Sequence, residues 1–336
     1  MSDNEKFIII TSIYPPSEAI ARYAAMKGWN LVVVGDRKTP ENWQYENVTY
    51  LSPTDQIELG YSLGSVLPWN HYCRKMIGYL YAMEQGASII VDTDDDNIPK
   101  DDWCFPAFEG TFREIPKSSG FVNMYAYFTE MKIWPRGYPL QYINDPAHTS
   151  VPQLSEKETI NVGIWQGLAD GNPDVDAIYR LIDDTPCYFN RQYPIALSEG
   201  TICPFNSQNT AIRKELFPLL YLPSYVTFRF TDILRGLIAQ PVMWAAGYSL
   251  GFSSATVFQE RNPHDYLKDF ESEIPCYLYA EKVIELVSDV VTPDAPVLEN
   301  LATAYRILKD HGIVPPEEMK VITAWQDNLK TIENQL

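Results

Sequence analysis

The sequence has no run of eighteen apolar residues among its 336, so it predicts no helix that could span a membrane. Its first residues, MSDNEKFIIITS, lack the basic segment of a signal peptide and lead directly into a strand-like run. The five cysteines are scattered, odd in number and never spaced as Cys-x-x-Cys, which argues against a disulfide framework. Together these absences favour reduced thiols and a cytoplasmic location.

Basic residues are scarce, because 26 Lys and Arg stand against 44 Asp and Glu and leave a formal net charge of −18. A protein that binds nucleic acid without sequence preference needs a basic face, so nucleic acid is not the expected partner. The four histidines are scattered, which argues against a His-rich zinc site. The segment from Gly60 to Gly64 has neither GxGxxG spacing nor a Walker lysine, so it predicts no phosphate loop.

The sequence does contain ample material for a core, since 46% of its residues are hydrophobic and 13% are aromatic. Apolar strand patterns alternate with helix patterns in the first hundred residues. The expected strands cover residues 7–12, 30–35, 47–51 and 88–92, and the expected helices cover residues 17–28 and 70–85. Ser17 is the expected N-cap of the first helix, and Gly28 its stop. Continuous apolar strands in this rhythm are typical of a parallel sheet with helices on both faces.

The middle of the chain, from about residue 100 to 260, is irregular and rich in Pro, Tyr and Trp. Strand patterns occur at residues 120–128 and 159–164, and helix patterns at residues 174–183 and 229–240. The final sixty or so residues have helical periodicity with polar faces, which predicts a C-terminal group of helices.

The most informative segment follows the last of the four strands, where Asp92, Asp94, Asp95 and Asp96 lie within five residues. The carboxyl end of a parallel strand is where open α/β sheets bind ligands. Mg²⁺ and Mn²⁺ take hard oxygen ligands and share their sites with substrate phosphates. The cluster therefore predicts a divalent cation that grips a nucleotide diphosphate. The alternative is a solvated acidic turn that caps the next helix.

Four further segments, in order, make the sequence resemble the GT-A glycosyltransferases, and more closely the plant STELLO proteins and their bacterial relatives. They are VGDRKTP (34–40), RKMIGY (74–79), PFNSQNT (204–210) and RFTDILRG (229–236). The segment TDDD (93–96) is also similar to the Asp-Asp-Asp segment of the reversibly glycosylated polypeptides, which act as UDP-arabinopyranose mutases. Unlike in the STELLO proteins, no membrane anchor is expected here, so the resemblance carries over no Golgi role.

The resemblance implies a GT-A-like (Rossmann-like) α/β fold with a mixed, mainly parallel sheet flanked by helices. It divides the chain into a catalytic domain over residues 1–277 and a C-terminal helical subdomain over residues 278–336. Within the first, residues 1–100 form the nucleotide-binding half and residues 101–277 the acceptor half. The implied metal ligands are Asp94 and Asp96, and the implied donor-binding residues are Asp36, Arg37, Lys38, Arg74, Asp92 and Asp95. The alternatives are a solvated loop for Arg37 and Lys38, and a charge-balancing helix pair for Arg74 and Lys75.

In the acceptor half, two segments rich in hydrogen-bonding side chains are candidates for sugar contact. Carboxylates and amides can bind sugar hydroxyls, and the face of a Trp can pack on a pyranose ring. The candidates are Trp165, Asp170, Asn206, Gln208 and Asn209, together with Arg229 and Arg235. The alternative is that turns, helix ends and the protein's own backbone satisfy these groups.

Asp232 is the candidate catalytic base. With Thr231 as an N-cap it would lie beside the positive end of a helix, which keeps a carboxylate ionised. The resemblance to inverting GT-A enzymes implies that an acid here deprotonates the acceptor hydroxyl. The alternative is that Asp232 only complements the helix dipole, paired with Arg229 and Arg235. His264 is a further candidate metal ligand, because GT-A enzymes often use a late histidine, and its alternative is a structural role.

These observations favour metal-dependent transfer of a sugar from a nucleotide diphosphate donor to an acceptor glycan or other hydroxyl compound. The expected donor is a UDP-sugar. The expected cofactor is Mn²⁺ or Mg²⁺. A nucleotide-sugar mutase would use the same donor pocket without a separate acceptor. A third hypothesis is a non-catalytic scaffold or partner subunit with a GT-A fold. The sequence leaves open the sugar, the acceptor, the anomeric outcome and a homo-oligomer formed through the polar C-terminal helices.

Overall fold

The first half of the main sheet is parallel, as its continuous apolar runs predicted. The computed structural model describes residues 5–117, 120–151, 154–260 and 264–335. Strands β1 (Lys6–Thr11), β2 (Asn30–Val34), β3 (Val48–Leu51) and β4 (Ile89–Thr93) lie in the order β3-β2-β1-β4. Ile9 of β1 stands beside Val32 of β2 on one side and beside Asp92 of β4 on the other. The order of the strands therefore reverses between β1 and β4.

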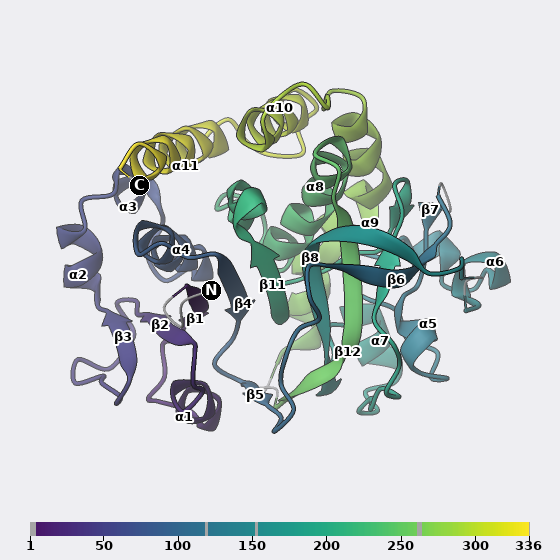
Figure 1. The fold of residues 1–336 in the computed structure, drawn as a ribbon, viewed down its shortest axis with the longest axis horizontal. Coiled ribbons are helices and arrows are strands. Elements are labelled where there is room, and N and C mark those ends of the chain that lie inside the picture. The colour runs from purple at the N-terminus through teal and green to yellow at the C-terminus, as the bar shows by residue number, and fades with distance from the viewer. Residues whose placement is uncertain (1–4, 118–119, 152–153, 261–263, 336) are drawn as a thin grey trace.

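Helices cover both faces of these strands because neighbouring side chains of a strand point to opposite faces. Ile8 and Ile10 pack in one core with Ile20 of α1 (Glu18–Ala24), whereas Ile9 packs in another with Ile77 of α4 (Lys75–Glu84). Figure 1 shows α1 and α4 on opposite sides of the strands. Ser17 caps α1 as predicted, since its hydroxyl accepts a hydrogen bond from the Ile20 N–H at 3.3 Å.

The second half of the sheet is mixed. β11 (Asn209–Arg213) lies between β4 and β8 (Glu158–Gly171) and is antiparallel to both, and β12 (Ser249–Gln259) is parallel to β8. The shorter strands are β5 (Asn97–Pro99), β6 (Glu109–Ile115), β9 (Ile195–Leu197), and the separate pair β7 (Gly120–Phe121) and β10 (Thr201–Ile202). The predicted GT-A-like α/β architecture is confirmed, and β4 with its acidic cluster is a central strand.

The remaining elements are mostly short. The α-helices are α2 (Pro53–Glu58), α3 (Ser62–Val66), α5 (Tyr125–Phe128), α6 (Pro146–Thr149), α7 (Ala177–Ile182) and α8 (Thr231–Ala245). The 3-10 helices are η1 (Tyr72–Arg74), η2 (Leu140–Tyr142), η3 (Lys214–Leu220) and η4 (Phe228–Phe230). The strand predicted over residues 120–128 is wrong after Phe121. Asn123 turns the chain there, because its side-chain oxygen accepts from the Tyr125 N–H and its amide donates to the Ile133 carbonyl.

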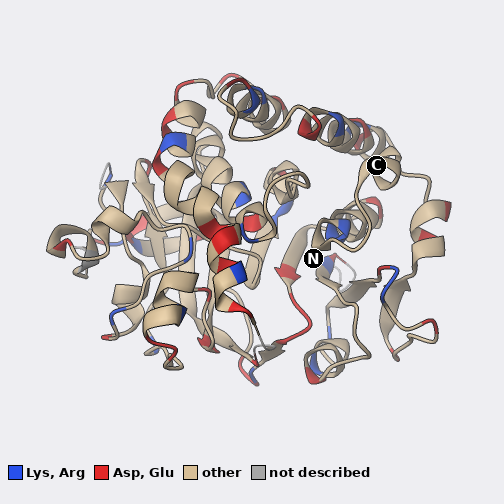
Figure 2. Ribbon diagram, turned by 180° about the vertical axis from the view of Figure 1, so that it is seen from behind, with Lys and Arg blue, Asp and Glu red and all other residues tan. Residues whose placement is uncertain are grey.

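Three helices end the chain: α9 (Tyr266–Ser288), α10 (Val297–Asp310) and α11 (Glu318–Glu333). The boundary predicted after residue 277 falls inside α9. Figure 1 shows α10 and α11 running along one side of the molecule from α8 to α3, and Figure 2 shows acidic and basic residues interspersed along both helices. Asn328 of α11 accepts from the Leu63 N–H of α3 at 3.0 Å. No helix within the described residues combines the length and the apolar character needed to cross a membrane.

Candidate functional site

Two cavities meet where β4 ends. Cavity A has a volume of about 220 Å³, and cavity B about 190 Å³. Cavity A is lined by residues that include Asp94, Asp96, Arg136, Asp174, Asn206, Ser207, Gln208, Arg229, Asp232, Gln259 and His264. Cavity B is lined by residues that include Ser12, Gly35, Asp36, Lys38, Asn70, His71, Arg74 and Asp95. Tyr72 and Phe228 line both, so these two rings form the wall between the cavities.

Asp92 anchors the end of β4 below the cavities and lines neither of them. Lys75 Nζ donates to Asp92 Oδ1 at 2.8 Å, and Arg235 Nη1 donates to Asp92 Oδ2 at 2.6 Å. Burial alone would raise the pKa of Asp92, but the two cations lower it below its usual value. Asp92 and Arg235 therefore form a buried ion pair with Lys75, and we no longer assign Asp92 to the donor or Arg235 to the sugar.

Lys75 balances the acidic cluster from beneath, which was one of the two interpretations of its position in the sequence. Its side chain is fully buried and also donates to the Thr93 carbonyl and to Asp94 Oδ1, both at 2.8 Å. Burial would lower the pKa of this ammonium group, but Asp92 and Asp94 raise it above its usual value. Lys75 is therefore a fixed charge that holds the cluster together.

Asp94 and Asp96 line cavity A, and of these two carboxylates Lys75 pairs with Asp94. Burial, with Asp92 and Asp95 nearby, raises the pKa of Asp94 to about 6 despite Lys75. Burial and the neighbouring Asp94 and Asp95 raise the pKa of Asp96 to about 7. Gln259 donates to Asp96 Oδ2 at 3.2 Å, while Oδ1 is buried without a hydrogen-bond partner in the described structure. An unpartnered buried carboxylate oxygen of this kind suits a cation.

The carboxylate oxygens of Asp94 and Asp96 fit a hard divalent cation that completes its coordination shell with substrate oxygens. Within the described residues, no group of three or more His, Cys, Asp and Glu side chains is arranged to hold a metal ion. Asp94 and Asp96 would thus contribute two ligands, the small number that Mg²⁺ uses beside phosphates. Asp95 points to cavity B instead, where the Ser12 hydroxyl donates to its Oδ2.

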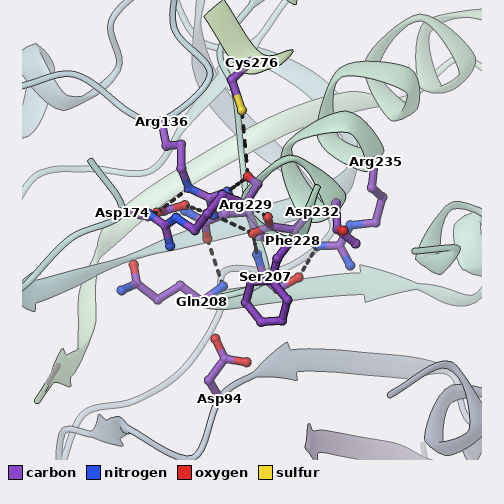
Figure 3. A network of polar contacts seen from close by, with 12 residues as sticks. Asp94, Arg136, Asp174, Ser207, Gln208, Phe228, Arg229, Asp232, Arg235 and Cys276 are labelled. Atoms are coloured by element: carbon purple, nitrogen blue, oxygen red, sulfur yellow. Dashed lines mark hydrogen bonds and ion pairs between the residues drawn. The ribbon is translucent and has the colours of Figure 1, made fainter. Parts of the chain in front are cut away.

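Asp232 faces cavity A from the side opposite Asp94 (Figure 3). Its carboxylate is held by Arg136, whose Nη1 and Nη2 donate to Oδ1 and Oδ2 at 3.1 and 3.0 Å. Burial would raise the pKa of Asp232, but Arg136 above all, with Arg235 and Arg229, lowers it. An efficient base has a pKa near the working pH, so this environment makes Asp232 a weak base. The predicted Thr231 cap is wrong, because Phe230 takes the N-cap position and makes no side-chain cap.

Arg136 is clamped between two carboxylates. Its Nε and Nη2 donate to Asp174 Oδ1 and Oδ2, both at 2.8 Å, on the side away from Asp232. Arg229 lines the same cavity, and Glu273 of α9 accepts from its Nε at 2.9 Å. The alternative interpretation paired Asp232 with Arg229 and Arg235, but Arg136 forms the ion pair with Asp232.

Cavity B lies at the carboxyl ends of β1 and β2. Asp36 follows β2, and its carboxylate accepts from the N–H groups of Arg37 and His71 at 2.7 and 3.2 Å. Arg74 is buried, donates to Gln56 Oε1 at 2.9 Å, and keeps a buried Nη2 without a hydrogen-bond partner in the described structure. The guanidinium groups of Arg74 and Arg37 lie 3.7 and 4.8 Å from the centroid of the Trp69 ring. Of the predicted donor residues, Asp36, Lys38, Arg74 and Asp95 line this cavity.

The PFNSQNT segment divides between cavity and core. Asn206, Ser207 and Gln208 line cavity A, and the Gln208 amide donates to the Asn172 carbonyl at 3.1 Å. Asn209 is fully buried in β11 between Trp103 Nε1 and Thr256 Oγ1, at 3.3 and 3.0 Å. The assignment of Asn209 to a sugar is therefore corrected, because its hydrogen bonds are made inside the sheet.

Trp165 and Asp170 do not reach cavity A either. Both lie in β8, which the sequence predicted only up to residue 164. The Trp165 ring is fully buried against Phe112, and its Nε1 donates to the Ala107 carbonyl. Asp170 is bound by Lys100 Nζ at 2.5 Å and by the Phe189 N–H at 2.8 Å. The predicted sugar-recognition loop is instead a central strand.

His264 lines cavity A, as its assignment as a further metal ligand requires. Its Nδ1 lies 2.9 Å from Asp269 Oδ2, which leaves Nε2 as the ring nitrogen available to a ligand. The sequence interpretation missed Arg136, Gln259, Tyr72 and Phe228 as lining residues. Arg136 occurs in an irregular Trp-Pro-Arg-Gly segment, and no local pattern connects it to Asp232, which is 96 residues away.

Comparison with known proteins agrees with the sequence motifs. Residues 229–335 match the family model of the STELLO glycosyltransferases. Two Arabidopsis thaliana proteins, "Probable glycosyltransferase STELLO2" and "Probable glycosyltransferase STELLO1", are each 26% identical to this chain over 98% of its length. The match covers 45% of each of them, so the chain spans less than half the length of these relatives. The predicted resemblance to STELLO glycosyltransferases is confirmed.

Proposed function

We propose that this protein is a metal-dependent glycosyltransferase that moves a sugar from a nucleotide diphosphate donor to a hydroxyl group of an acceptor. The proposal is carried by one observation: the carboxylates Asp94 and Asp96 line cavity A at the end of β4, beside cavity B, and both have raised pKa values. The similarity to proteins named as glycosyltransferases supports the same reaction class.

Cavity B suits the nucleotide. It lies outside the carboxyl ends of β1 and β2, next to the point between β1 and β4 where the strand order reverses, and open α/β sheets bind nucleotides there. Lys38 and the unpartnered Nη2 of Arg74 supply donors to base or phosphate oxygens. We propose uridine diphosphate as the nucleotide because the sequence resembles the UDP-arabinopyranose mutases.

Cavity A suits the transferred sugar and the acceptor. Asp94 and Asp96 would hold Mn²⁺ or Mg²⁺ on its floor. His264 lines the same cavity but is not arranged with them as a third ligand in the described structure. When bound, the cation would neutralise negative charge on the leaving diphosphate. The Tyr72 and Phe228 rings, whose centroids lie 4.7 Å apart, separate this space from cavity B.

A nucleotide-sugar mutase is the second candidate function, and the state of Asp232 favours it. The carboxylate is held by Arg136 and has a lowered pKa, so it is poorly suited to deprotonate an acceptor. A mutase requires no such base. Incubation of the protein with Mn²⁺ and a UDP-sugar alone separates the two functions, because only a mutase produces a ring isomer without an added acceptor.

Ligand-induced stabilisation tests the shared donor site. A ligand that binds only the folded state raises the unfolding midpoint, by about 2.7 kcal/mol of stability at a concentration of one hundred times its Kd. We expect UDP with Mn²⁺ to raise the midpoint more than either alone, and EDTA to remove the difference. The control is Asp101→Asn, whose exposed side chain follows β5 and should leave the shift unchanged. The absence of any shift would favour the non-catalytic scaffold.

We expect Asp232 to assist sugar transfer by holding the Arg136 guanidinium in position. Asp232→Asn should bind donor and metal nearly normally, while turnover falls by about 10²-fold because Arg136 is no longer held in place. Arg136→Lys keeps the charge but loses the forked geometry, so it should show a similar loss. The double variant should be no slower than the slower single variant, because residues that act as a unit are not additive. Losses that multiply, together with a pH–rate limb that disappears in Asp232→Asn, would instead identify Asp232 as the base.

A further inference from the structure

His71 lines cavity B directly before η1, and its ring is held there from two sides. The imidazole lies nearly parallel to the Tyr72 ring, at an angle of 12° and a centroid distance of 5.3 Å. The Phe228 ring packs against it at a steep angle, with the centroids 5.5 Å apart. The backbone N–H of His71 donates to Asp36 Oδ2 at 3.2 Å, which ties this residue to the end of β2. The two rings that separate the cavities therefore also fix the position of the imidazole.

A backbone hydrogen bond decides which nitrogen of His71 carries the proton. The Cys73 N–H donates to Nδ1 at 3.1 Å, and a ring nitrogen that accepts a hydrogen bond carries no proton in a neutral imidazole. Burial lowers the pKa of His71, and Asp36 offsets only part of this effect, so the ring is neutral at neutral pH. Within the described residues, no hydrogen bond reaches Nε2. His71 therefore offers cavity B one uncharged N–H donor.

Cavity B has the extent and the donors that a nucleotide requires. It reaches from Asp95 after β4, past Ser12 after β1, to Asp36 after β2, which is two strand spacings or about 10 Å. A nucleoside whose phosphates lie at the β4 end can extend over this distance. Arg74 lines the same cavity and has a buried Nη2 without a hydrogen-bond partner in the described structure. Buried donors need acceptors, and base carbonyls and phosphates supply oxygen acceptors.

We propose that His71 is a nucleotide-binding residue whose Nε2–H donates to an oxygen of the donor nucleotide, either a base carbonyl or a phosphate. This inference rests on the proposed function and adds a binding residue to it. The competing role is structural, because His71 also caps η1 through Nδ1. The two roles use different nitrogen atoms of one ring, so substitutions can separate them.

His71→Asn and His71→Gln form the matched pair. Asparagine is a favoured N-cap residue, so its side-chain oxygen can replace Nδ1 while the Nε2 donor is lost. Glutamine can place an amide N–H near the position of Nε2, but it loses the cap. We expect His71→Asn to keep the unfolding midpoint and to bind UDP about three- to tenfold more weakly, the scale of one uncharged hydrogen bond. We expect His71→Gln to bind UDP nearly as tightly as the wild type and to unfold at a lower midpoint. Calorimetry with Mn²⁺ present measures the binding.

Uridine identifies the oxygen that His71 contacts. If it is a base carbonyl, His71→Asn should lose the same factor in affinity for uridine as for UDP. If it is a phosphate oxygen, uridine should bind to the variant and the wild type alike. The control is His311→Asn, the same exchange at an exposed histidine after α10, which should leave UDP binding unchanged.

Three results would overturn the proposal. One is a folded His71→Asn variant that binds UDP as tightly as the wild type, and another is weaker binding by His71→Gln than by His71→Asn. The third needs no variant: nitrogen NMR of the unaltered protein should show the Nε2–H tautomer of His71 and a shift of that signal on binding of UDP. An Nδ1–H tautomer, or an unshifted signal in the UDP complex, would contradict the assignment. A wild-type protein that does not bind UDP would instead overturn the proposed function on which the inference rests.

Discussion

Asp96→Asn should lower metal-dependent turnover by about 10²- to 10³-fold, the scale of losing one preorganised electrostatic group. Asp96 Oδ1 is the buried oxygen without a hydrogen-bond partner beside cavity A, and it is the atom best placed to ligate a cation. An amide oxygen carries no net charge, so the variant should also lose the stabilisation that Mn²⁺ gives to the UDP complex. Full turnover by the variant would show that the metal assignment is wrong.

The same substitution should stabilise the metal-free protein. The pKa of Asp96 is about 7 in the folded protein and about 3.9 in an unfolded chain, so the unfolded state loses its proton first as pH rises. This carboxyl therefore costs the folded state stability progressively between about pH 4 and 7, by about 1.4 kcal/mol for each pKa unit. Asp96→Asn removes that cost. We expect it to equal the wild type near pH 4 and to exceed it above pH 7.

Urea denaturation at pH 4.5 and 7.5 in EDTA measures this difference. The matched control is Asp101→Asn, whose side chain is fully exposed and whose effect should stay within about 0.5 kcal/mol at both pH values. A variant that is less stable than the wild type at pH 7.5 would mean that the Asp96 carboxylate is structural. A gain in stability with a loss of turnover is the trade-off expected at a strained active site.

Lys75→Met should destabilise the protein by about 3–5 kcal/mol, because it leaves buried carboxylates uncompensated. Lys75 donates to Asp92, Asp94 and the Thr93 carbonyl from a fully buried position, and Arg235 would remain as the single cation on Asp92. Methionine has a similar length and adapts its shape readily, so the lost charge dominates the effect rather than a cavity.

A surface lysine gives the matched control. Lys268 lies 3.6 Å from Asp265 with most of its side chain exposed, so Lys268→Met should change stability by less than about 1 kcal/mol. The double variant Lys75→Met with Asp94→Asn should recover part of the lost stability but none of the turnover, because one of the uncompensated carboxylates is gone. Equal urea midpoints for Lys75→Met and the wild type would contradict the assignment of Lys75 as the central charge.

Local sequence was sufficient to predict a strand or a helix cap whose structure depends on its own residues. The runs FIII, LVVV and IIV are typical of parallel strands covered on both faces, and they form β1, β2 and β4 as predicted. Ser17 could be identified as a cap because an N-cap bonds within its own helix. Sequence reasoning failed for β8, whose segment WQGLADG resembles a turn, because only its neighbours β11 and β12 turn it into a strand.

In the candidate site, too, the sequence determined some features and the tertiary structure determined others. The four carboxylates had to lie together because five residues of chain cannot separate them, and the end of an apolar strand fixed their place in the sheet. Which of them is neutralised was decided by the tertiary structure. Asp92 receives hydrogen bonds from Lys75 and Arg235, which are 17 and 143 residues away, whereas the described partner of the Asp96 carboxylate is Gln259.

The sequence by itself determined the parallel half of the sheet, the acidic end of β4 and the resemblance to glycosyltransferases. The tertiary structure alone decided that Asp232 is held by Arg136, that Trp165 and Asn209 are buried, and that Asp94 and Asp96 line one cavity while Asp95 lines the other. The physical reason is the range of each interaction. Strand patterns and caps depend on neighbours along the chain, whereas the ionisation and exposure of a side chain depend on whichever distant elements pack beside it.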